Sequence, residues 1–354
     1  MGNLQQTLHD ISTFGLEKRQ FLQKILNPET FDAEANLPQT PGFLAQTNTW
    51  QQVFDLAQKN GTQAFLLETL NRVIWKNALP TKTRLILAEL NARENLIASI
   101  GLEDLRIACK GLCEAKTCFT ILSSNQMWRE IYPTSTPCPT HTNQILIRPG
   151  DLPRALSILG RLGFRAPNDS SAGTNNHCLY RPHSFQGLVI THGFSRSRFH
   201  LSHEEYESNT REIQIPGLEG MERRTCTLSN RFLLLHLLSE AITQKVPINT
   251  SQALDLWFSA TTAERDIQGD PTQFIDHLKS TRTLSMAWFL LGISKKTSSQ
   301  MGPHQVMNLV GQNISPFKKK IIDQQIKHFS LLNSNSNSLG ARVKQRVEQQ
   351  WLRR

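Results

Sequence analysis

Histidines are the side chains of this sequence whose types and spacing could hold a metal ion. Five of them fall between positions 177 and 203, and two form the stretch His200-Leu-Ser-His203, which Glu204 follows. In a helix this spacing places both imidazoles on one face. Because no third ligand stands at a fixed spacing, surface or hydrogen-bonding histidines are the favoured interpretation, with a metal site as the alternative. The five are His177, His183, His192, His200 and His203.

The six cysteines form neither a CxxC pair nor the dense framework of a disulfide-stabilised secreted protein. Cys109, Cys113 and Cys118 stand near helical spacing and could share a face. Because no fourth ligand stands at zinc-finger spacing, we interpret them as buried thiols. The chain also lacks a phosphate-binding loop, a GxGxxG motif, an HExxH helix and a GxSxG motif. We therefore expect no cofactor.

A basic C-terminal segment carries most of the excess positive charge. The net charge is +10, and residues 317–354 contribute nine Lys or Arg against two acids. After an Asn/Ser linker at 333–338, Val343, Val347 and Trp351 lie on one helical stripe. This pattern predicts that Trp351 anchors a protein partner while the surrounding basic residues steer an acidic surface toward it. Docking on the chain's own C-terminal helices and nucleic-acid binding are the alternatives. The surrounding basic residues are Arg342, Lys344, Arg346 and Arg353.

Length and composition indicate a globular protein with more than one packed unit. The chain has 354 residues, of which 38% are hydrophobic and 19% charged. No apolar run approaches the roughly 20 residues that a membrane span needs, and the N-terminus lacks the pattern of a secretory signal. We therefore expect a cytoplasmic protein without membrane attachment.

Hydrophobic periodicity predicts helices at both ends of the chain and a small sheet between them. Three β-branched runs predict strands at 117–122, 144–148 and 188–192. Helices are expected at 81–114, 125–131, 232–244, 251–260, 271–279 and 284–291. A further helix follows Asp151, which we expect to be its N-cap, and Gly163 should end it.

These elements define an α/β (α+β) fold in which helical regions flank a small mixed sheet. We expect an N-terminal helical region at 1–115, an α/β unit at 116–227 and a C-terminal helical unit at 228–332. The linker and basic helix occupy 333–354.

The middle of the chain resembles a poorly characterised bacterial nucleotidyltransferase family of the DNA polymerase β superfamily. The family pattern has a strand ending in Leu-Lys-Gly, a Tyr-Pro pair, an arginine, an Asp-x-Asp strand and a basic-Pro-x-Asp-Leu helix start. The similarity runs in order from about Trp50 to Leu291. It rests on Phe119-Thr-Ile-Leu-Ser-Ser, Tyr132-Pro133, Ile145-Leu-Ile, Arg148-Pro-Gly-Asp-Leu, Leu162-Gly-Phe, Val189-Ile-Thr-His192, Leu233-Leu-Leu-His236 and Leu254-Asp255-Leu. The resemblance implies a nucleotidyltransferase-like sheet.

The residues that such an enzyme needs are replaced in this sequence. The two family aspartates fall on Thr142 and Gln144, and the third carboxylate falls near Ile190. The family arginine falls on Cys138, and the lysine–glycine pair falls on Ser123 and Ser124. Nucleotidyl transfer needs carboxylates that hold Mg²⁺, and neutral oxygens do not balance the charge of the metal. The resemblance therefore implies a degenerate member without the standard metal site.

Three hypotheses follow from these replacements. In the first, the protein is a scaffold subunit of a biosynthetic complex with a partner enzyme, because relatives of the family are associated with peptide natural products and surface polysaccharides. Maturation of a precursor peptide, as in antibiotic biosynthesis, is such a setting. In the second, it is an active nucleotidyltransferase with a rebuilt site. In the third, it binds nucleic acid through the basic segment.

Overall fold

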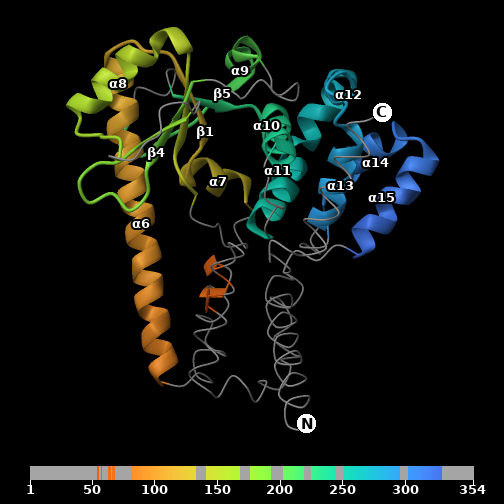
Figure 1. Ribbon diagram of the computed structural model, residues 1–354, viewed down its shortest axis with the longest axis horizontal. Helices are drawn as coiled ribbons and strands as arrows, with labels where there is room; N and C mark the ends of the chain where they lie inside the picture. The colour runs from red at the N-terminus through yellow and green to blue at the C-terminus, as the bar shows by residue number, and fades with distance from the viewer. Residues whose placement is uncertain are drawn as a thin grey trace, which may run out of the picture.

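The computed structural model describes residues 81–132, 141–167, 176–192, 202–218, 225–243, 250–295 and 302–328, and a few single positions between 54 and 67. Figure 1 shows a sheet at one end of the molecule and a group of helices at the other. In the described part of the chain, no helix is long and apolar enough to cross a membrane. The elements, in order, are α6 (Thr81–Glu114), β1 (Phe119–Ser123), α7 (Asn125–Ile131), β2 (Gln144–Ile147), the 3-10 helix η2 (Pro149–Asp151), α8 (Leu152–Arg161), β3 (Asn176–Leu179), β4 (Leu188–Thr191), α9 (His203–Ser208), β5 (Thr210–Glu212), β6 (Cys226–Leu228), α10 (Asn230–Thr243), α11 (Thr250–Gly269), α12 (Pro271–Ser280), α13 (Leu284–Lys295), α14 (His304–Gln312) and α15 (Pro316–His328).

The six strands form one mixed sheet in the order β3-β4-β2-β1-β6-β5. Strands β1 and β2 are antiparallel, whereas β2 pairs in parallel with β4 and β1 pairs in parallel with β6. Strands β3 and β5 add antiparallel edges. The mixed α/β fold is therefore confirmed, and three of its strands are those predicted from the β-branched runs.

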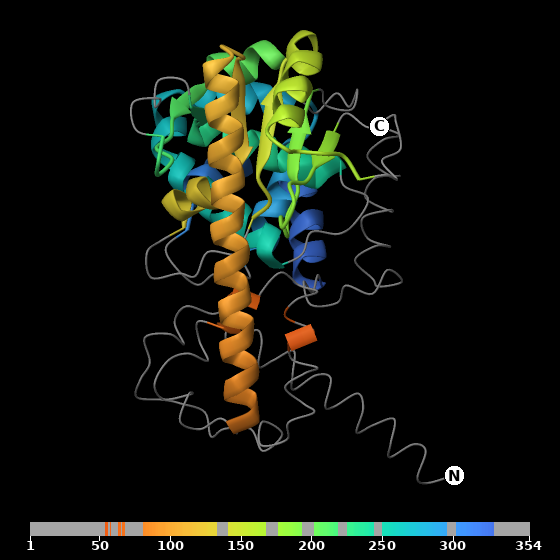
Figure 2. The same ribbon diagram turned by 90° about the vertical axis from the view of Figure 1, so that its left-hand side faces the viewer.

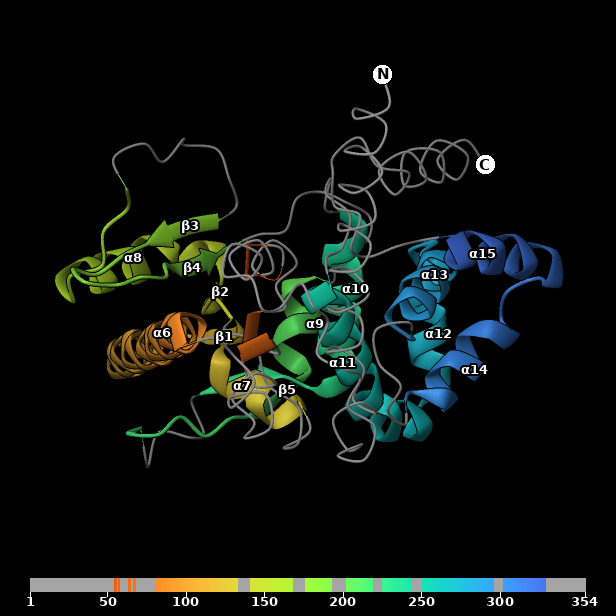
Figure 3. The same cartoon turned by 90° about the horizontal axis from the view of Figure 1, so that it is seen from below.

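Helices α6, α7 and α8 are packed along one face of the sheet. Nδ2 of Asn143, just before β2, donates a 2.6 Å hydrogen bond to the Gly101 carbonyl of α6. The Thr227 hydroxyl of β6 lies 3.1 Å from Sδ of Met127 in α7. A Cβ atom at Gly111 of α6 would press on Leu162 at the end of α8, so these helices approach closely. Figure 3 shows α6 and α8 on one side of the sheet and α10 and α11 on the other.

Asp151 is the N-cap residue of α8, as predicted, but the capping hydrogen bond expected of its side chain is absent. The chain enters α8 through the 3-10 turn η2, so Asp151 already has helical dihedral angles, with φ −90° and ψ −9°. An N-cap residue accepts from the following amides when its backbone is extended, which Asp151 is not. Gly163, with φ of 88°, does end this helix as predicted.

The C-terminal helices pack around leucine-rich segments of α10 and α11. Gly302 lies against the indole of Trp257 in α11, where a larger residue would overlap the ring. Helix α15 docks on α13 because Nε1 of Trp288 donates to Asp323 at 2.9 Å and Lys319 lies over the same indole. Buried residues form a continuous cluster from Leu105 in α6 to Ile314 after α14. The sheet is thus supported from both sides.

Candidate functional site

The positions that correspond to the nucleotidyltransferase site gather where β1 ends and β2 begins. Ser123 at the end of β1 pairs with Gln144 at the start of β2. Ser124 follows β1 directly, and Thr142 lies two residues before Gln144. We call Ser123, Ser124, Thr142 and Gln144 the β1–β2 edge. The antiparallel pairing therefore brings together residues that are about 20 positions apart in the sequence.

Neutral hydrogen bonds occupy three of these four side chains. The Ser124 hydroxyl accepts from the Met127 amide at 3.1 Å and is the N-cap of α7. The Ser123 hydroxyl accepts from Nε1 of Trp128, also at 3.1 Å. Nε2 of Gln144 donates to the Thr191 hydroxyl at 3.0 Å. Thr142 is exposed. The β1–β2 edge thus carries no charge of its own, and its donor set does not fit Mg²⁺.

The sheet register changes the expectation for the third carboxylate position. Ile190 is buried and pairs with Ile145, so it lies on the face of the sheet opposite to Gln144. Side chains alternate between faces along a strand, which places Val189 and Thr191 on the face of Gln144. Thr191, one residue beyond the expected position, is therefore the side chain that meets Gln144. Cys138 lies outside the described residues.

A buried polar cluster next to this edge joins α7 and the start of β2 to α11. The Tyr132 hydroxyl donates to Oδ1 of Asp255 at 2.6 Å, and Nε2 of His141 lies 3.5 Å from the same oxygen. The His141 ring stacks on Trp128 with centroids 4.6 Å apart. The backbone amide of His141 donates to Oδ1 of Asn125. We call Tyr132, His141 and Asp255 the Tyr–His–Asp cluster.

Burial keeps both ionisable partners of the Tyr–His–Asp cluster neutral. Desolvation raises the pKa of Asp255 to about 8, and the hydrogen bond from Tyr132 offsets this increase in part. Desolvation lowers the pKa of His141 to about 3. The contact between His141 and Asp255 is therefore not an ion pair at neutral pH. A carboxyl group that holds its proton is a poor ligand for a divalent cation.

Sequence reasoning missed Asp255 as part of this site. Asp255 comes from α11, a helix that follows the sheet in the chain and is far in sequence from both strands of the β1–β2 edge. The Tyr-Pro pair and the Leu-Asp-Leu segment both appear in the resemblance, yet nothing in their spacing indicates that they meet. The sequence did contain one indication of this role, because Asp255 stands within a run of apolar helical residues, where an acid is expected to be buried and to need a partner.

The predicted histidine and cysteine groups come together only in part. His177 in β3 and His192, directly after β4, have ring centroids 5.1 Å apart. His200 and the side chain of His203 lie outside the described part. Cys109 and Cys113 are buried, as expected for structural thiols, and burial raises the pKa of Cys109. The prediction is wrong for Cys118, which is exposed because it follows the turn that ends α6. Within the described ranges, no group of three metal-ligating side chains occurs.

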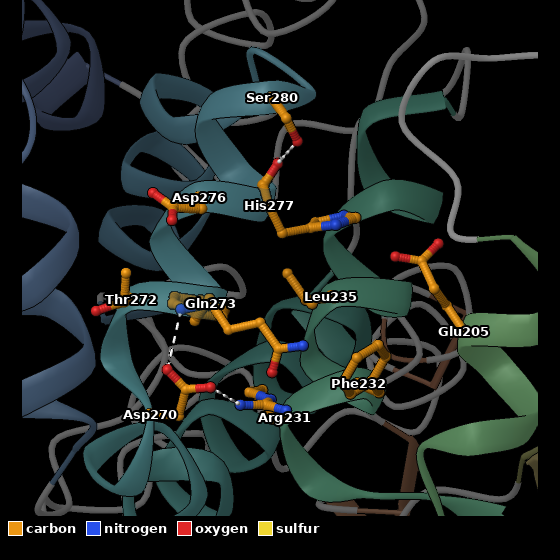
Figure 4. A pocket seen from close by; sticks show the side chains of 11 residues that line it. Glu205, Arg231, Phe232, Leu235, Asp270, Thr272, Gln273, Asp276, His277 and Ser280 are labelled. Atoms are coloured by element: carbon orange, nitrogen blue, oxygen red, sulfur yellow. Dashed lines mark hydrogen bonds and ion pairs between the residues drawn. The ribbon is translucent and has the colours of Figure 1, made fainter.

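A cavity of about 520 Å³ lies between α9, α10 and α12. Figure 4 shows Arg231 and Asp270 on one side of it and His277 and Glu205 on the other. Asp270 accepts from the Gln273 amide at 3.2 Å and lies 3.7 Å from Arg231, so both charged groups already have protein partners. Burial lowers the pKa of His277, and Glu205 raises it in part. This cavity is lined by groups that organise the start of α12.

The predicted partner-binding residues Trp351, Arg342, Lys344, Arg346 and Arg353 lie outside the described residues. The beginning of the basic segment is described as α15, which exposes Lys318, Lys320 and Phe317.

No protein-family model, curated protein or solved structure matches the chain.

Proposed function

We propose that the chain is a catalytically degenerate nucleotidyltransferase-like protein that acts as a binding subunit of a biosynthetic complex. One observation carries this proposal. The β1–β2 edge, where metal-binding carboxylates would be needed, consists of neutral side chains, three of which are engaged in internal hydrogen bonds. Removing these side chains from their partners would leave buried groups unsatisfied, so they are not available to a nucleotide.

The order of the elements supports the same reading. Strand β1, helix α7, strand β2, helix α8 and strand β4 follow one another as the resemblance requires. The Tyr-Pro and Leu-Asp-Leu segments also meet, through Tyr132 and Asp255. A sheet that keeps its order and its supporting contacts, but not its charges, suits a protein that presents surfaces rather than one that transfers a nucleotide.

An active enzyme with a rebuilt site is the second candidate, and Asp255 is the observation that favours it. Asp255 is a carboxyl group near the β1–β2 edge, beside His141. Its burial and its raised pKa oppose metal binding, because the carboxylate form is disfavoured at neutral pH. We therefore place this candidate second.

Calorimetry separates the two candidates. The purified chain is titrated with each of the four Mg²⁺–nucleoside triphosphates at pH 7.5, with EDTA as the control. We expect no saturable binding in the micromolar range. Micromolar binding that EDTA abolishes would instead support the rebuilt site, and Asp255→Asn should then remove it. A melting curve before each titration confirms that the sample is folded.

The binding role is tested with the partner itself. Co-purification from the native host, with mass spectrometry of the bound protein, identifies the enzyme or precursor peptide. The rate of that enzyme is then measured with and without the chain. We expect a higher rate when the chain is present and no dependence on nucleoside triphosphates. An unchanged rate in a reconstituted complex would refute the scaffold role. If RNA or DNA co-purifies instead, the dependence of its affinity on salt measures the phosphate contacts.

A further inference from the structure

A second cavity, of about 480 Å³, lies at the opposite end of β1 and β2 from the β1–β2 edge. Its lining includes Phe119 and Thr120 at the start of β1 and Leu146 and Arg148 at the end of β2. The register pairs Phe119 with Ile147, whereas Ser123 pairs with Gln144. Four residues of strand separate the two ends, which is about 13 Å. This cavity is therefore a different place from the site that the resemblance implies.

The floor of the cavity is the sheet face that α6, α7 and α8 leave uncovered. Leu146 lies two residues after Gln144 in β2, so both side chains are on the same face, opposite to that of Ile145. Thr120 pairs with Cys226 of β6, and both line the cavity. Leu146 makes this floor apolar, while Phe119, which pairs with Ile147 and so belongs to the opposite face, lines the cavity from the start of β1. The volume lies in the range of small-molecule sites, about 300–1,000 Å³.

Lys116 lines the cavity from an unusual backbone position. Helix α6 ends in a Schellman motif, in which the Thr117 amide donates to the Leu112 carbonyl and the Lys116 amide donates to the Cys113 carbonyl. Lys116 has a φ of 53°, in the left-handed region where glycine is usual. This backbone conformation is less favourable for lysine than for glycine, but the lysine supplies a positive charge beside the cavity.

Three charged residues line the cavity: Lys116, Arg148 and Glu207. Both terminal oxygens of Glu207 accept hydrogen bonds from the Arg148 guanidinium, so these two charges are matched. Lys116 is the remaining charge of the lining. The cavity therefore has a net charge of about +1, with its apolar floor below.

Thr117 provides an independent indication of a ligand. It lines the cavity and is only 5% exposed. Its hydroxyl is buried and has no hydrogen-bond partner within the part of the chain that the structure describes. A buried hydroxyl without a partner is unfavourable by about 1–3 kcal/mol, so such groups in native proteins usually meet a ligand or water.

We propose that this cavity binds a small molecule with an apolar body and one anionic head group. The Lys116 ammonium and the Thr117 hydroxyl meet the head group, and Phe119 and Leu146 contact the body. The binding involves no covalent step. Because it uses neither the β1–β2 edge nor the basic segment, it does not depend on the function proposed above.

Two fluorescent probes of similar shape test the charge requirement. The anionic probe is 1-anilinonaphthalene-8-sulfonate, and the neutral probe is N-phenyl-1-naphthylamine. In Lys116→Met, which keeps the side-chain length, the affinity for the anionic probe should fall roughly ten-fold while that for the neutral probe is unchanged. Lys110→Met is the matched control, because Lys110 is exposed on α6 and does not line the cavity. Equal affinities in all three proteins would overturn the proposal.

Cysteine labelling locates the bound probe. Cys226 and Cys118 line the cavity, whereas Cys178 in β3 does not. The labelling is done with iodoacetamide at mildly alkaline pH, because burial raises the pKa of the Cys226 thiol. Saturating anionic probe should protect Cys226 and Cys118 at least several-fold and leave Cys178 unchanged. Probe binding that protects none of them, or all of them equally, would place the site elsewhere.

Competition identifies the head group that the site accepts. Octanoate and octyl phosphate should displace the anionic probe, whereas octanol should not. Displacement by only one of the two anions distinguishes a carboxylate site from a phosphate site. Displacement by octanol with equal affinity would contradict the role of Lys116. The variant Cys226→Phe, which fills the cavity, should abolish the binding of both probes while its melting temperature shows that it remains folded.

Discussion

The Tyr132 hydroxyl hydrogen-bonds to the Asp255 carboxyl across 123 residues of sequence, at a distance of 2.6 Å. Tyr132 follows α7 on the sheet side, and Asp255 lies in α11 among the C-terminal helices. The ring of Tyr132 also packs against Phe258 in α11, with centroids 4.7 Å apart. The sheet and the helices are therefore joined by a buried contact in which a neutral acid replaces the usual ion pair.

Asp255 should make the protein less stable as the pH rises from 6.5 to 8. Its pKa of about 8 in the folded state exceeds the unfolded value of 3.8, so the folded state binds more protons in this range. The free energy of unfolding then falls with pH, by on the order of 1–2 kcal/mol over this window. We expect Asp255→Asn to remove this decline. Urea unfolding at pH 6.5, 7.2 and 8 measures it.

The measurement is restricted to pH 6.5–8 because, below pH 6.5, buried histidines make the free energy of unfolding rise with pH rather than fall. Burial lowers the pKa of His141 to about 3 and also lowers those of His236 and His277. The stability that comes from keeping these histidines neutral is fully present above pH 6.5, the histidine pKa in the unfolded state, and is lost as the pH falls below that value. Above pH 6.5, the decline belongs to Asp255 alone among these groups. A wild-type protein whose stability is constant from pH 6.5 to 8 would contradict the neutral carboxyl.

Tyr132→Phe should destabilise the protein by about 1–2 kcal/mol, because the buried Asp255 loses its hydrogen-bond donor. The same change removes an interaction that lowers the pKa of Asp255, so the pH at which stability declines should move upward. Tyr180→Phe is the control, since Tyr180 is exposed. Chemical unfolding of the three proteins at pH 6.5 and 8 gives both quantities. Equal losses in the two variants would show that the Asp255 contact contributes nothing.

Ser124→Ala should cost about 1 kcal/mol or more, whereas Asp151→Ala should cost less than about 0.5 kcal/mol. Ser124 is buried and caps α7 through its hydroxyl, but the Asp151 side chain caps nothing. Both residues directly precede a helix, so the pair separates the capping hydrogen bond from the position. Urea midpoints at pH 7 decide the order, and the reverse order would refute the assignment of the two caps.

Asp104→Ala should destabilise the protein by about 2–4 kcal/mol, because it removes the acceptor that holds residues 181–184 against α6. Asp104 is buried and accepts from Nη1 of Arg181 at 3.0 Å and from the Ser184 hydroxyl. The neighbouring Glu103→Ala is the control. Glu103 pairs with Arg106 on the surface, where such pairs contribute less than about 1 kcal/mol. Thermal and urea unfolding should therefore distinguish adjacent acids on the same helix.

Local sequence signals predicted the elements with strong periodicity or clear boundaries. The long helix 81–114, the strands at β1, β2 and β4, and helices α7, α8, α10, α12 and α13 all occur. Strands β3, β5 and β6 were missed because none of them contains a run of β-branched and apolar residues, so each is defined by pairing with a neighbour. Helix α11 extends to Gly269, beyond the predicted end at 260, and the hydroxyls of Thr261 and Thr262 within it donate to carbonyls of the preceding turn.

The site was less predictable than the fold for a physical reason. The resemblance assigned Ser123 and Gln144 to one site, and the direct pairing of their adjacent strands does bring them together. Asp255 and Thr191 depend on how α11 packs and on the register of β4, which are not local properties. At Asp151 the local signal was misleading instead: aspartate suits the N-cap position, but the helical backbone conformation at this residue prevents a capping hydrogen bond from its side chain.

Helix α6 has a consequence for local unfolding. It spans 34 residues, about 51 Å, and Figure 2 shows it as one continuous helix. Seven of its nine buried residues lie between Gly101 and Cys113, beside the sheet, while the first twenty residues contribute only Thr83 and Leu87. Amide protons should therefore exchange along a gradient, fastest near Thr81 and slowest near Leu112. The turn that presents Lys116 to its cavity is thus fixed at the slow-exchanging end, so fraying of the other end leaves that binding geometry intact.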